Sequence, residues 1–259
     1  MKLNIIKFLS IVSISICVMI YFYHYGYTAG QNRAAKEYKI KLEEEVETAV
    51  TEALAQARKE AEYEKELEEG KEEILLVNKK NRLPSDYEVE LITLPDKVNK
   101  AAKEAYTPLV DMLTAGRKQG LKFEICSSYR DVKVQERLYI EDVIALMRKG
   151  VPYEEAYAEV SKETMPPGHS EHSTGLAFDI VALDYQLLDS RQQYTPESIW
   201  LREHCAEYGF ILRYPKDKED ITQISFESWH FRYVGVEAAK YIMEHELCLE
   251  EYLKMSFSD

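Results

Sequence analysis

The pattern of hydrophobic and polar positions divides the chain into three parts. Residues 8–23 form a run without a charged side chain, and Ile5 and Ile6 precede it. Residues 34–69 contain neither proline nor glycine and are rich in Ala, Glu, Lys and Leu, which favours one long helix that ends near Gly70. From residue 74 onward, short apolar runs and amphipathic segments follow one another, as expected for a compact domain.

This third part predicts a mixture of strands and helices. Short apolar runs predict strands at residues 74–77, 123–127, 176–181, 210–215 and 225–234. Amphipathic segments predict helices at residues 97–120, 132–149, 152–162, 196–208 and 236–246. Thr195 is placed to cap the fourth of these helices, with Pro196 at its first position. Because strands and helices do not alternate regularly, we predict an α+β fold with a small mixed or antiparallel sheet flanked by helices.

The first 30 residues have the features of a membrane anchor. The uncharged run and its flanking isoleucines approach the roughly 20 residues that span a bilayer. Lys2 and Lys7 precede the run and would stay in the cytoplasm, and aromatic residues follow it, as in an interfacial belt. The alternative is a cleaved signal peptide, but Tyr27 would then occupy a position that requires a small residue. We therefore predict a single-pass anchor at residues 1–30, with everything after Ala29 outside the cytoplasm.

The charge of the chain is concentrated behind this anchor. The net charge is −13, and residues 36–73, with 14 acidic and seven basic side chains, carry about half of it. Such an acidic chain argues against a nucleic-acid partner, because phosphate binding requires clustered lysine and arginine. Residues 31–73 are predicted to form a solvated helical stalk. The alternative is a weak coiled coil that would pair two chains through a thin, alanine-rich apolar stripe.

The cysteines do not suggest a metal site. Cys17 lies in the uncharged run, and Cys126, Cys205 and Cys248 are far apart, so no C-x-x-C pair occurs. We expect small buried residues, although a disulfide between Cys126 and Cys205, or between Cys205 and Cys248, stays open.

Two segments carry the candidate chemistry. The stretch "GHSEHSTGLAFDI" (residues 168–180) combines metal-capable side chains with small apolar ones, and "FESWHFRYVG" (226–235) places Glu227 and His230 three residues apart. On a regular strand, residues three apart face opposite sides. Both reach one site only if a bulge or a strand end turns the chain, or if they approach it at different depths. In such apolar surroundings, charged groups are costly unless they are paired, and a metal ion would pair them.

The residue types fit a catalytic zinc site. His172, Asp179 and His230 supply two imidazoles and a carboxylate, which leaves a fourth position for water. Glu227 is then free to act as a general base toward that water. Arg130 follows the strand at 123–127, and a fixed cation near a scissile carbonyl would stabilise the charge that develops on its oxygen. We expect the remaining histidines, His24, His169, His204 and His245, to play no part in metal binding.

The motifs also resemble those of a known family. "SEHSTGLAFD" matches S-x-H-x-x-G-x-A-x-D, and "ESWH" matches E-x-W-H. Together with "SSYR" and "GFILRYP", they resemble the VanY-type D-alanyl-D-alanine carboxypeptidases, which are zinc peptidases of the bacterial cell wall, over about residues 74–253. By this resemblance, the zinc ligands are His172, Asp179 and His230, the catalytic base is Glu227, the carbonyl-stabilising residue is Arg130, and the substrate-contacting residues are Ser170 and Gln135.

The chain departs from the family pattern in two places. Ser128 stands where relatives usually have the glycine of S-G-Y-R, which would make the turn more crowded or more polar. The segment 146–167 is longer than in many relatives, and we expect it to form a flap that influences substrate choice.

The resemblance implies a zinc carboxypeptidase domain at residues 74–259, held at the outer face of a bacterial membrane. It would remove the terminal D-alanine from the peptidoglycan stem peptide, the residue to which glycopeptide antibiotics bind. The alternatives are an L,D-carboxypeptidase that acts on the tetrapeptide stem, an endopeptidase that cuts cross-links, and a non-catalytic wall-binding module. The presence of all three ligands and Glu227 argues against the last.

Overall fold

The structure, a computed structural model, describes residues 33–162 and 164–256, in two compact units. The first unit is the part of helix α2 (Arg33–Glu72) that precedes Leu67, and the second unit begins at Leu67. The predicted long helix is therefore present, although it continues through Gly70 to Glu72. The predicted anchor at residues 1–30 lies outside the described residues. Among the residues that are described, no helix has an apolar stretch long enough to cross a bilayer.

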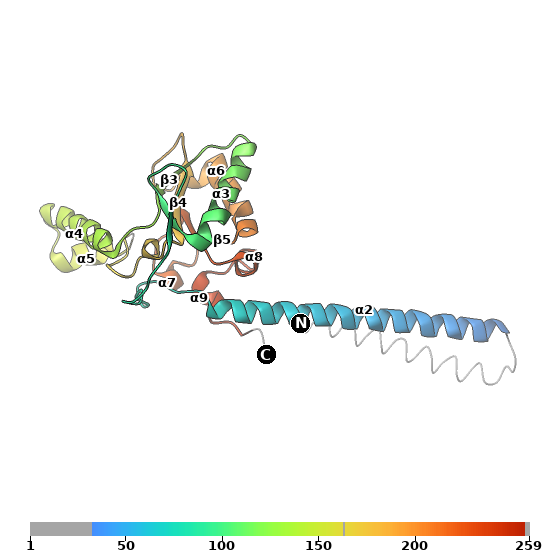
Figure 1. Cartoon of the computed structure of the whole chain (residues 1–259). Helices are drawn as coiled ribbons and strands as arrows, with labels where there is room; N and C mark the ends of the chain where they lie inside the picture. Colours follow the sequence, from blue (N-terminus) through green and yellow to red (C-terminus); the bar gives the residue numbers. More distant parts are fainter. Residues whose placement is uncertain (1–32, 163, 257–259) are drawn as a thin grey trace. The chain divides into compact units, whose positions relative to one another are not determined.

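The second unit is built around a four-stranded antiparallel sheet (Figure 1). Its strands, in spatial order, are β3 (Phe123–Ser127), β4 (Ala177–Ala182), β6 (Glu227–Tyr233) and β5 (Phe210–Tyr214). A separate hairpin, which was not predicted, pairs β1 (Leu91–Thr93) with β2 (Lys100–Ala102). The expected small sheet flanked by helices is confirmed.

Helices cover one face of this sheet. Helix α3 (Lys103–Lys118) and helix α6 (Pro196–His204), which continues as the 3-10 turn η3 (Cys205–Tyr208), pack against it. The core between them includes Leu109, Met112, Phe178, Ile180, Leu201 and Phe231. Thr195 caps α6 as predicted, because its hydroxyl accepts a hydrogen bond from the Ser198 amide.

Helix α3 begins later than the predicted start at residue 97. The side chain of Asp96 accepts hydrogen bonds from the amides of Val98 and Asn99, which closes a turn there. The chain then enters β2, whose backbone groups are used by β1. Local hydrogen bonds of this kind compete with helix formation, so the helix starts only at Lys103.

On the opposite face of the sheet, the C-terminal helices and the segment 74–77 cover Ile211 of β5. Helices α8 (Val236–Glu244) and α9 (Leu249–Tyr252) pack on Ile211 of β5 together with Ile74 and Leu76. The prediction that residues 74–77 form a strand is wrong. The carbonyl of Leu75 accepts a hydrogen bond from Arg232 at 2.7 Å, so this extended segment is held by a buried side chain.

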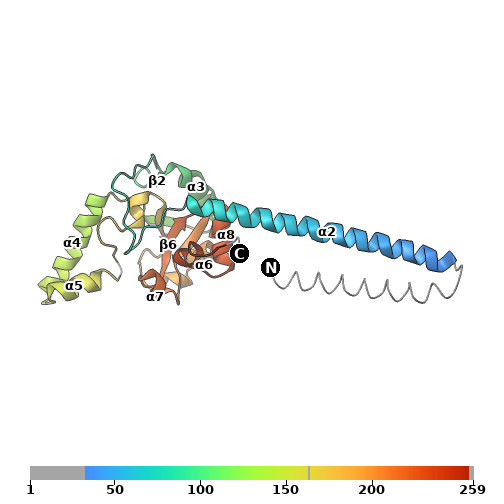
Figure 2. The same cartoon turned by 90° about the horizontal axis from the view of Figure 1, so that it is seen from below.

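Helices α4 (Val132–Arg148) and α5 (Tyr153–Val160) form a hairpin that lies to one side of the sheet (Figures 1 and 2). The hairpin has a small core of its own, formed by Tyr139, Val143, Ala156 and Val160. Short helical turns complete the unit: η1 (Glu171–Thr174), η2 (Gln192–Tyr194) and α7 (Glu219–Thr222). Cys126, Cys205 and Cys248 are free thiols; Cys205 and Cys248 are buried as predicted, whereas the prediction is wrong for Cys126, which is exposed. Burial raises the pKa of Cys205 to about 12.

Candidate active site

Strand pairing brings the first two candidate ligands together. Asp179 of β4 and His230 of β6 are directly paired across the sheet. Their neighbours Phe178 and Phe231 belong to the core under α3 and α6. Because side chains alternate along a strand, Asp179 and His230 share the opposite face.

A bulge in β6 brings Glu227 to the same place. Leu212 of β5 pairs with Phe231, whereas Tyr214 pairs with Glu227, so two extra residues of β6 are accommodated between these pairs. A bulge re-aims the side chains around it. The Glu227 Oε2 atom consequently lies 3.7 Å from His230 Nδ1. The sequence left open whether a bulge, a strand end or an approach at different depths would bring Glu227 and His230 to one site, and the structure shows a bulge.

The third candidate ligand comes from η1. This turn ends at Gly175, which adopts the left-handed conformation with φ of 75°. A Cβ atom there would lie 3.0 Å from the backbone nitrogen of Ala102, so a side chain would be both strained and crowded. The turn holds His172 with its Nε2 atom 3.3 Å from Asp179 Oδ2.

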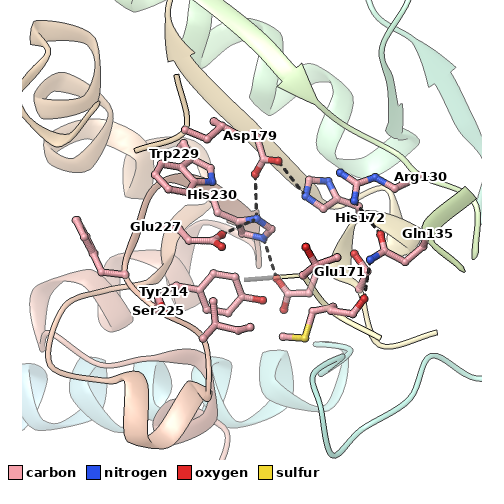
Figure 3. A pocket seen from close by; sticks show the side chains of 16 residues that line it. Arg130, Gln135, Glu171, His172, Asp179, Tyr214, Ser225, Glu227, Trp229 and His230 are labelled. Atoms are coloured by element: carbon pink, nitrogen blue, oxygen red, sulfur yellow. Dashed lines mark hydrogen bonds and ion pairs between the residues drawn. The ribbon is translucent and has the colours of Figure 1, made fainter. Parts of the chain in front are cut away.

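The two imidazoles have defined orientations (Figure 3). The Nδ1 atom of His172 is 2.9 Å from the carbonyl of Ser128 and must donate to it, so Nε2 offers a lone pair to the site. His230 points its Nδ1 atom at Asp179, at 3.0 Å, and its Nε2 atom at Glu171. One ligand atom from each of His172, Asp179 and His230 lies within 4.8 Å of the others, and all three residues are buried. Two nitrogens and one carboxylate oxygen, oriented by second partners, fit a zinc ion.

The charges of the metal-free site follow from these contacts. Burial raises the pKa of Asp179, but His172 and His230 lower it more strongly, so the net pKa lies well below the usual range. Burial lowers the pKa of His230, but Asp179 and Glu171 raise it more strongly, to about 9. At neutral pH, His230 is therefore protonated and Asp179 is ionised.

This charge state predicts that zinc binding releases protons. His230 must lose its proton to act as a ligand, so we expect about one proton to be released per zinc ion at pH 7.5. Because the pKa of His230 is raised to about 9, the number of protons released per zinc ion should fall only as the pH passes that value. Calorimetric zinc titrations in two buffers of different ionisation enthalpy measure the number of protons released. Binding without proton release at pH 7.5 would contradict this charge assignment.

All seven predicted site residues line one pocket of about 310 Å³, together with neighbouring residues that include members of η1, β5 and β6 (Figure 3). The predicted residues are Arg130, Gln135, Ser170, His172, Asp179, Glu227 and His230. The pocket is also lined by residues that the sequence did not single out, including Thr164, Met165, Glu171, Tyr214, Ser225 and Trp229.

Arg130 is fixed at the edge of this pocket. One terminal nitrogen of its guanidinium donates to Gln135 Oε1 at 2.8 Å and the other donates to Ser127 Oγ at 2.6 Å. Burial lowers the pKa of Arg130, and the charge of Asp179 opposes this shift. Since an arginine does not lose its proton in proteins, the pocket contains an immobilised cation.

Gln135 forms hydrogen bonds both to Arg130 and to Met165 in the wall of the pocket. Besides accepting from Arg130, its amide donates to the carbonyl of Met165 at 2.6 Å. An amide group has a second hydrogen and a second lone pair, so capacity remains for a substrate. Thr164 and Met165 lie in the segment 146–167, so the end of this segment contributes to the pocket.

The unusual Ser128 does not face the pocket. Its hydroxyl donates to Asn99 Oδ1 at 2.7 Å and accepts from the Lys100 amide at 3.1 Å. The side chain therefore ties the end of β3 to β2, and it is not among the residues that line the pocket. The serine thus adds polar contacts to the turn without lining the pocket.

The other described histidines lie outside the cluster. His169 Nδ1 is bonded to the carbonyl of Asn78, His204 pairs with Glu207, and His245 stacks on Tyr241. His24 lies outside the described residues.

Glu171 and Tyr214 were missed by the sequence interpretation. Glu171 is fully buried beside two arginines, and the ring of Tyr214 lies 4.9 Å from that of His230. Burial raises the pKa of Tyr214, so its hydroxyl keeps its proton. The available signal was Arg213 in the otherwise apolar strand β5 and Arg232 between Phe231 and Tyr233 of β6, because a buried arginine requires an acidic partner.

Comparison with known proteins identifies the family of this chain. The model of the VanY family, described as D-alanyl-D-alanine carboxypeptidase, matches residues 98–236. A D-alanyl-D-alanine carboxypeptidase of Enterococcus faecalis is 40% identical over 190 residues, which cover 72% of this chain and 68% of that protein.

Two solved structures are also similar. A mutant of the vancomycin-resistance D,D-pentapeptidase VanY from a VanB-type resistance cassette, in complex with Zn(II), is 39% identical with a TM-score of 0.61, covering 70% of this chain and 98% of that one. The LD-carboxypeptidase LdcB is 34% identical with a TM-score of 0.61, covering 69% of this chain and 84% of that one. The first of these structures contains zinc, and the chain described here has a His/Asp/His cluster that could bind a metal ion. The chain therefore belongs to the VanY family of D-alanyl-D-alanine carboxypeptidases.

Proposed function

We propose that this protein is a zinc-dependent D,D-carboxypeptidase that removes the C-terminal D-alanine from peptidoglycan stem peptides. The observation that carries the proposal is the convergence of His172, Asp179 and His230 with Glu227 and Arg130 in one pocket. Loss of that D-alanine would remove the residue to which glycopeptide antibiotics bind, so a contribution to resistance is part of the proposal.

The residues of the site have separate roles in the reaction. His172, Asp179 and His230 would hold a zinc ion, and zinc bound there would lower the pKa of water and polarise the scissile carbonyl. Glu227, beside His230, accepts a proton from the attacking water and passes it to the departing amine of D-alanine. Ser170 and the remaining hydrogen-bonding capacity of Gln135 contact the substrate.

Arg130 stabilises the negative charge that develops on the carbonyl oxygen. We expect Arg130→Ala to lower kcat by roughly a hundredfold, or about 3 kcal/mol, as when one oxyanion-hole donor is removed. KM should change little, because the interaction belongs to the transition state. Arg130→Lys should recover only part of the rate, since a point charge does not reproduce the planar fork of donors. Steady-state kinetics on a pentapeptide stem give both constants.

Zinc content is the control for both variants, and it should stay at the wild-type level. If Arg130→Ala raises KM alone, Arg130 binds the substrate in its ground state, and another group must stabilise the oxyanion.

The alternative of an L,D-carboxypeptidase is supported by a specific observation, because the LD-carboxypeptidase LdcB is as similar in fold as the D,D-enzyme. Incubation of the purified protein with pentapeptide and tetrapeptide stems, followed by mass spectrometry, separates the two. Loss of one alanine from the pentapeptide alone supports D,D-specificity, whereas cleavage of the tetrapeptide alone supports the alternative. The Glu227→Ala protein serves as the blank.

The location of the protein is a further part of the proposal. Residues 1–30 anchor it in a bacterial membrane, with residues 31–73 as a stalk and residues 74–259 on the outer side, where peptidoglycan is found. Protease added to intact protoplasts should then digest the domain of a protein that fractionates with membranes. A soluble form that starts near Gly30 would instead indicate a cleaved signal peptide.

A further inference from the structure

A buried charge network lies directly behind the zinc-site histidine of β6. Arg213 of β5 and Arg232 of β6 are almost completely inaccessible to solvent. The Oε1 atom of Glu171 accepts a hydrogen bond from Arg213 at 2.8 Å and lies 2.9 Å from Arg232. Glu250 of α9 binds the other two nitrogens of Arg213 at 2.7 and 2.8 Å. Two arginines and two glutamates therefore balance in charge and hold one another in place.

The second oxygen of Glu171 is directed at the site. Both arginines contact Oε1, whereas Oε2 lies 3.5 Å from the Nε2 atom of His230. Each of these two atoms is buried, and neither has a hydrogen-bond partner within the part of the chain that the structure describes. Figure 3 shows His230 between Asp179 on one side and Glu171 on the other. A shift of a few tenths of an ångström would close the hydrogen bond and satisfy both atoms.

We propose that Glu171 is a positioning residue for the zinc ligand His230. It accepts a hydrogen bond from the Nε2–H group of His230 and thereby leaves the lone pair on Nδ1, the atom that faces Asp179. A carboxylate behind a metal-binding histidine fixes the tautomer and the ring orientation and makes the ligand more basic. Arg213 and Arg232 keep this carboxylate from turning away. The inference rests on the zinc site of the proposed function, but it concerns metal affinity and can be tested without hydrolysis.

The first test compares two variants that remove the same charge from the same network. Glu171→Gln should weaken zinc binding by about 10- to 100-fold, as for other carboxylates that orient a metal-binding histidine. Glu250→Gln should leave the zinc affinity unchanged, because Glu250 contacts Arg213 and Asn78 but not His230. Competition with a chromophoric chelator on the purified full-length proteins measures the dissociation constant. Equal weakening in both variants, or no weakening in Glu171→Gln, overturns the proposal.

A double variant distinguishes the positioning of His230 by Glu171 from the balance of charge within the network. Glu171→Gln leaves one arginine uncompensated, and Glu171→Gln combined with Arg232→Gln restores a neutral network. The zinc affinity of the double variant should stay as low as that of the single variant. Recovery to the wild-type affinity would show that charge balance alone matters, and would overturn the proposal.

A measurement on the unaltered protein keeps the proposal testable even if the variants do not fold. In the zinc-loaded protein with ¹⁵N-labelled histidine, His172 should carry its proton on Nδ1, because that atom donates to Ser128. His230 should carry its proton on Nε2, facing Glu171. Two-dimensional spectra of the imidazole nitrogens distinguish these tautomers. A His230 protonated on Nδ1 overturns the proposal, whatever peptides the enzyme hydrolyses.

Discussion

Turnover by the Glu227→Ala protein should fall by roughly a hundredfold or more, while zinc should stay bound, on the scale of general-base contributions. The physical reason is that Glu227 is not part of the cluster formed by His172, Asp179 and His230, although its carboxylate lies 3.7 Å from His230. Removing it takes away the proton acceptor and leaves the ligands in place. Release of D-alanine from a pentapeptide stem measures the rate, and atomic absorption measures the zinc.

The control is Glu237→Ala, which changes an exposed acid on α8 and should behave like the wild type. Loss of zinc from the Glu227→Ala protein would contradict the account, because Glu227 would then be a ligand and the base would have to be another residue.

The His172→Ala protein is expected to lose both its zinc and its activity, down to the background rate. The substitution removes one of three ligand atoms from a cluster that spans 4.8 Å, and it also removes the bond to the Ser128 carbonyl. A zinc site left with two protein ligands binds its metal weakly. Zinc content and D-alanine release, measured on the same preparation, give both results.

The sequence offers a matched control for this variant three residues upstream. His169 is bonded to the carbonyl of Asn78 and lies outside the ligand cluster, so His169→Ala should keep its zinc and its turnover. Hydrolysis at the wild-type rate by the His172→Ala protein would contradict the assignment of His172 as a ligand.

The fold could be predicted where local patterns decide it. The strands at 123–127 and 210–214 and helix α4 follow from apolar runs and amphipathic spacing, and they appear almost as predicted. The hairpin of β1 and β2 was missed because its strands have three residues each, too few for a periodic pattern. The segment 74–77 was misassigned because its partner is Arg232, 157 residues away, which no local pattern reveals.

The site could be predicted from residue types, but its geometry could not. His172, Asp179 and His230 stand out because polar side chains close to apolar segments require partners. Whether Glu227 reaches the same site depended on the bulge opposite β5, which is set by strand pairing and not by the sequence of β6 alone. The sequence did not reveal Glu171 as a site residue for a related reason. Its partners Arg213 and Arg232 come from two strands that only the folded sheet brings together.

The most direct test of a single-zinc peptidase is to titrate metal-free protein with zinc in the presence of a pentapeptide stem. D-alanine release should begin near zero, rise in proportion to the added zinc and stop rising at one ion per chain, with the tetrapeptide as the accumulating product. Full hydrolysis by the metal-free protein, or no release of D-alanine at any zinc concentration, would contradict the account.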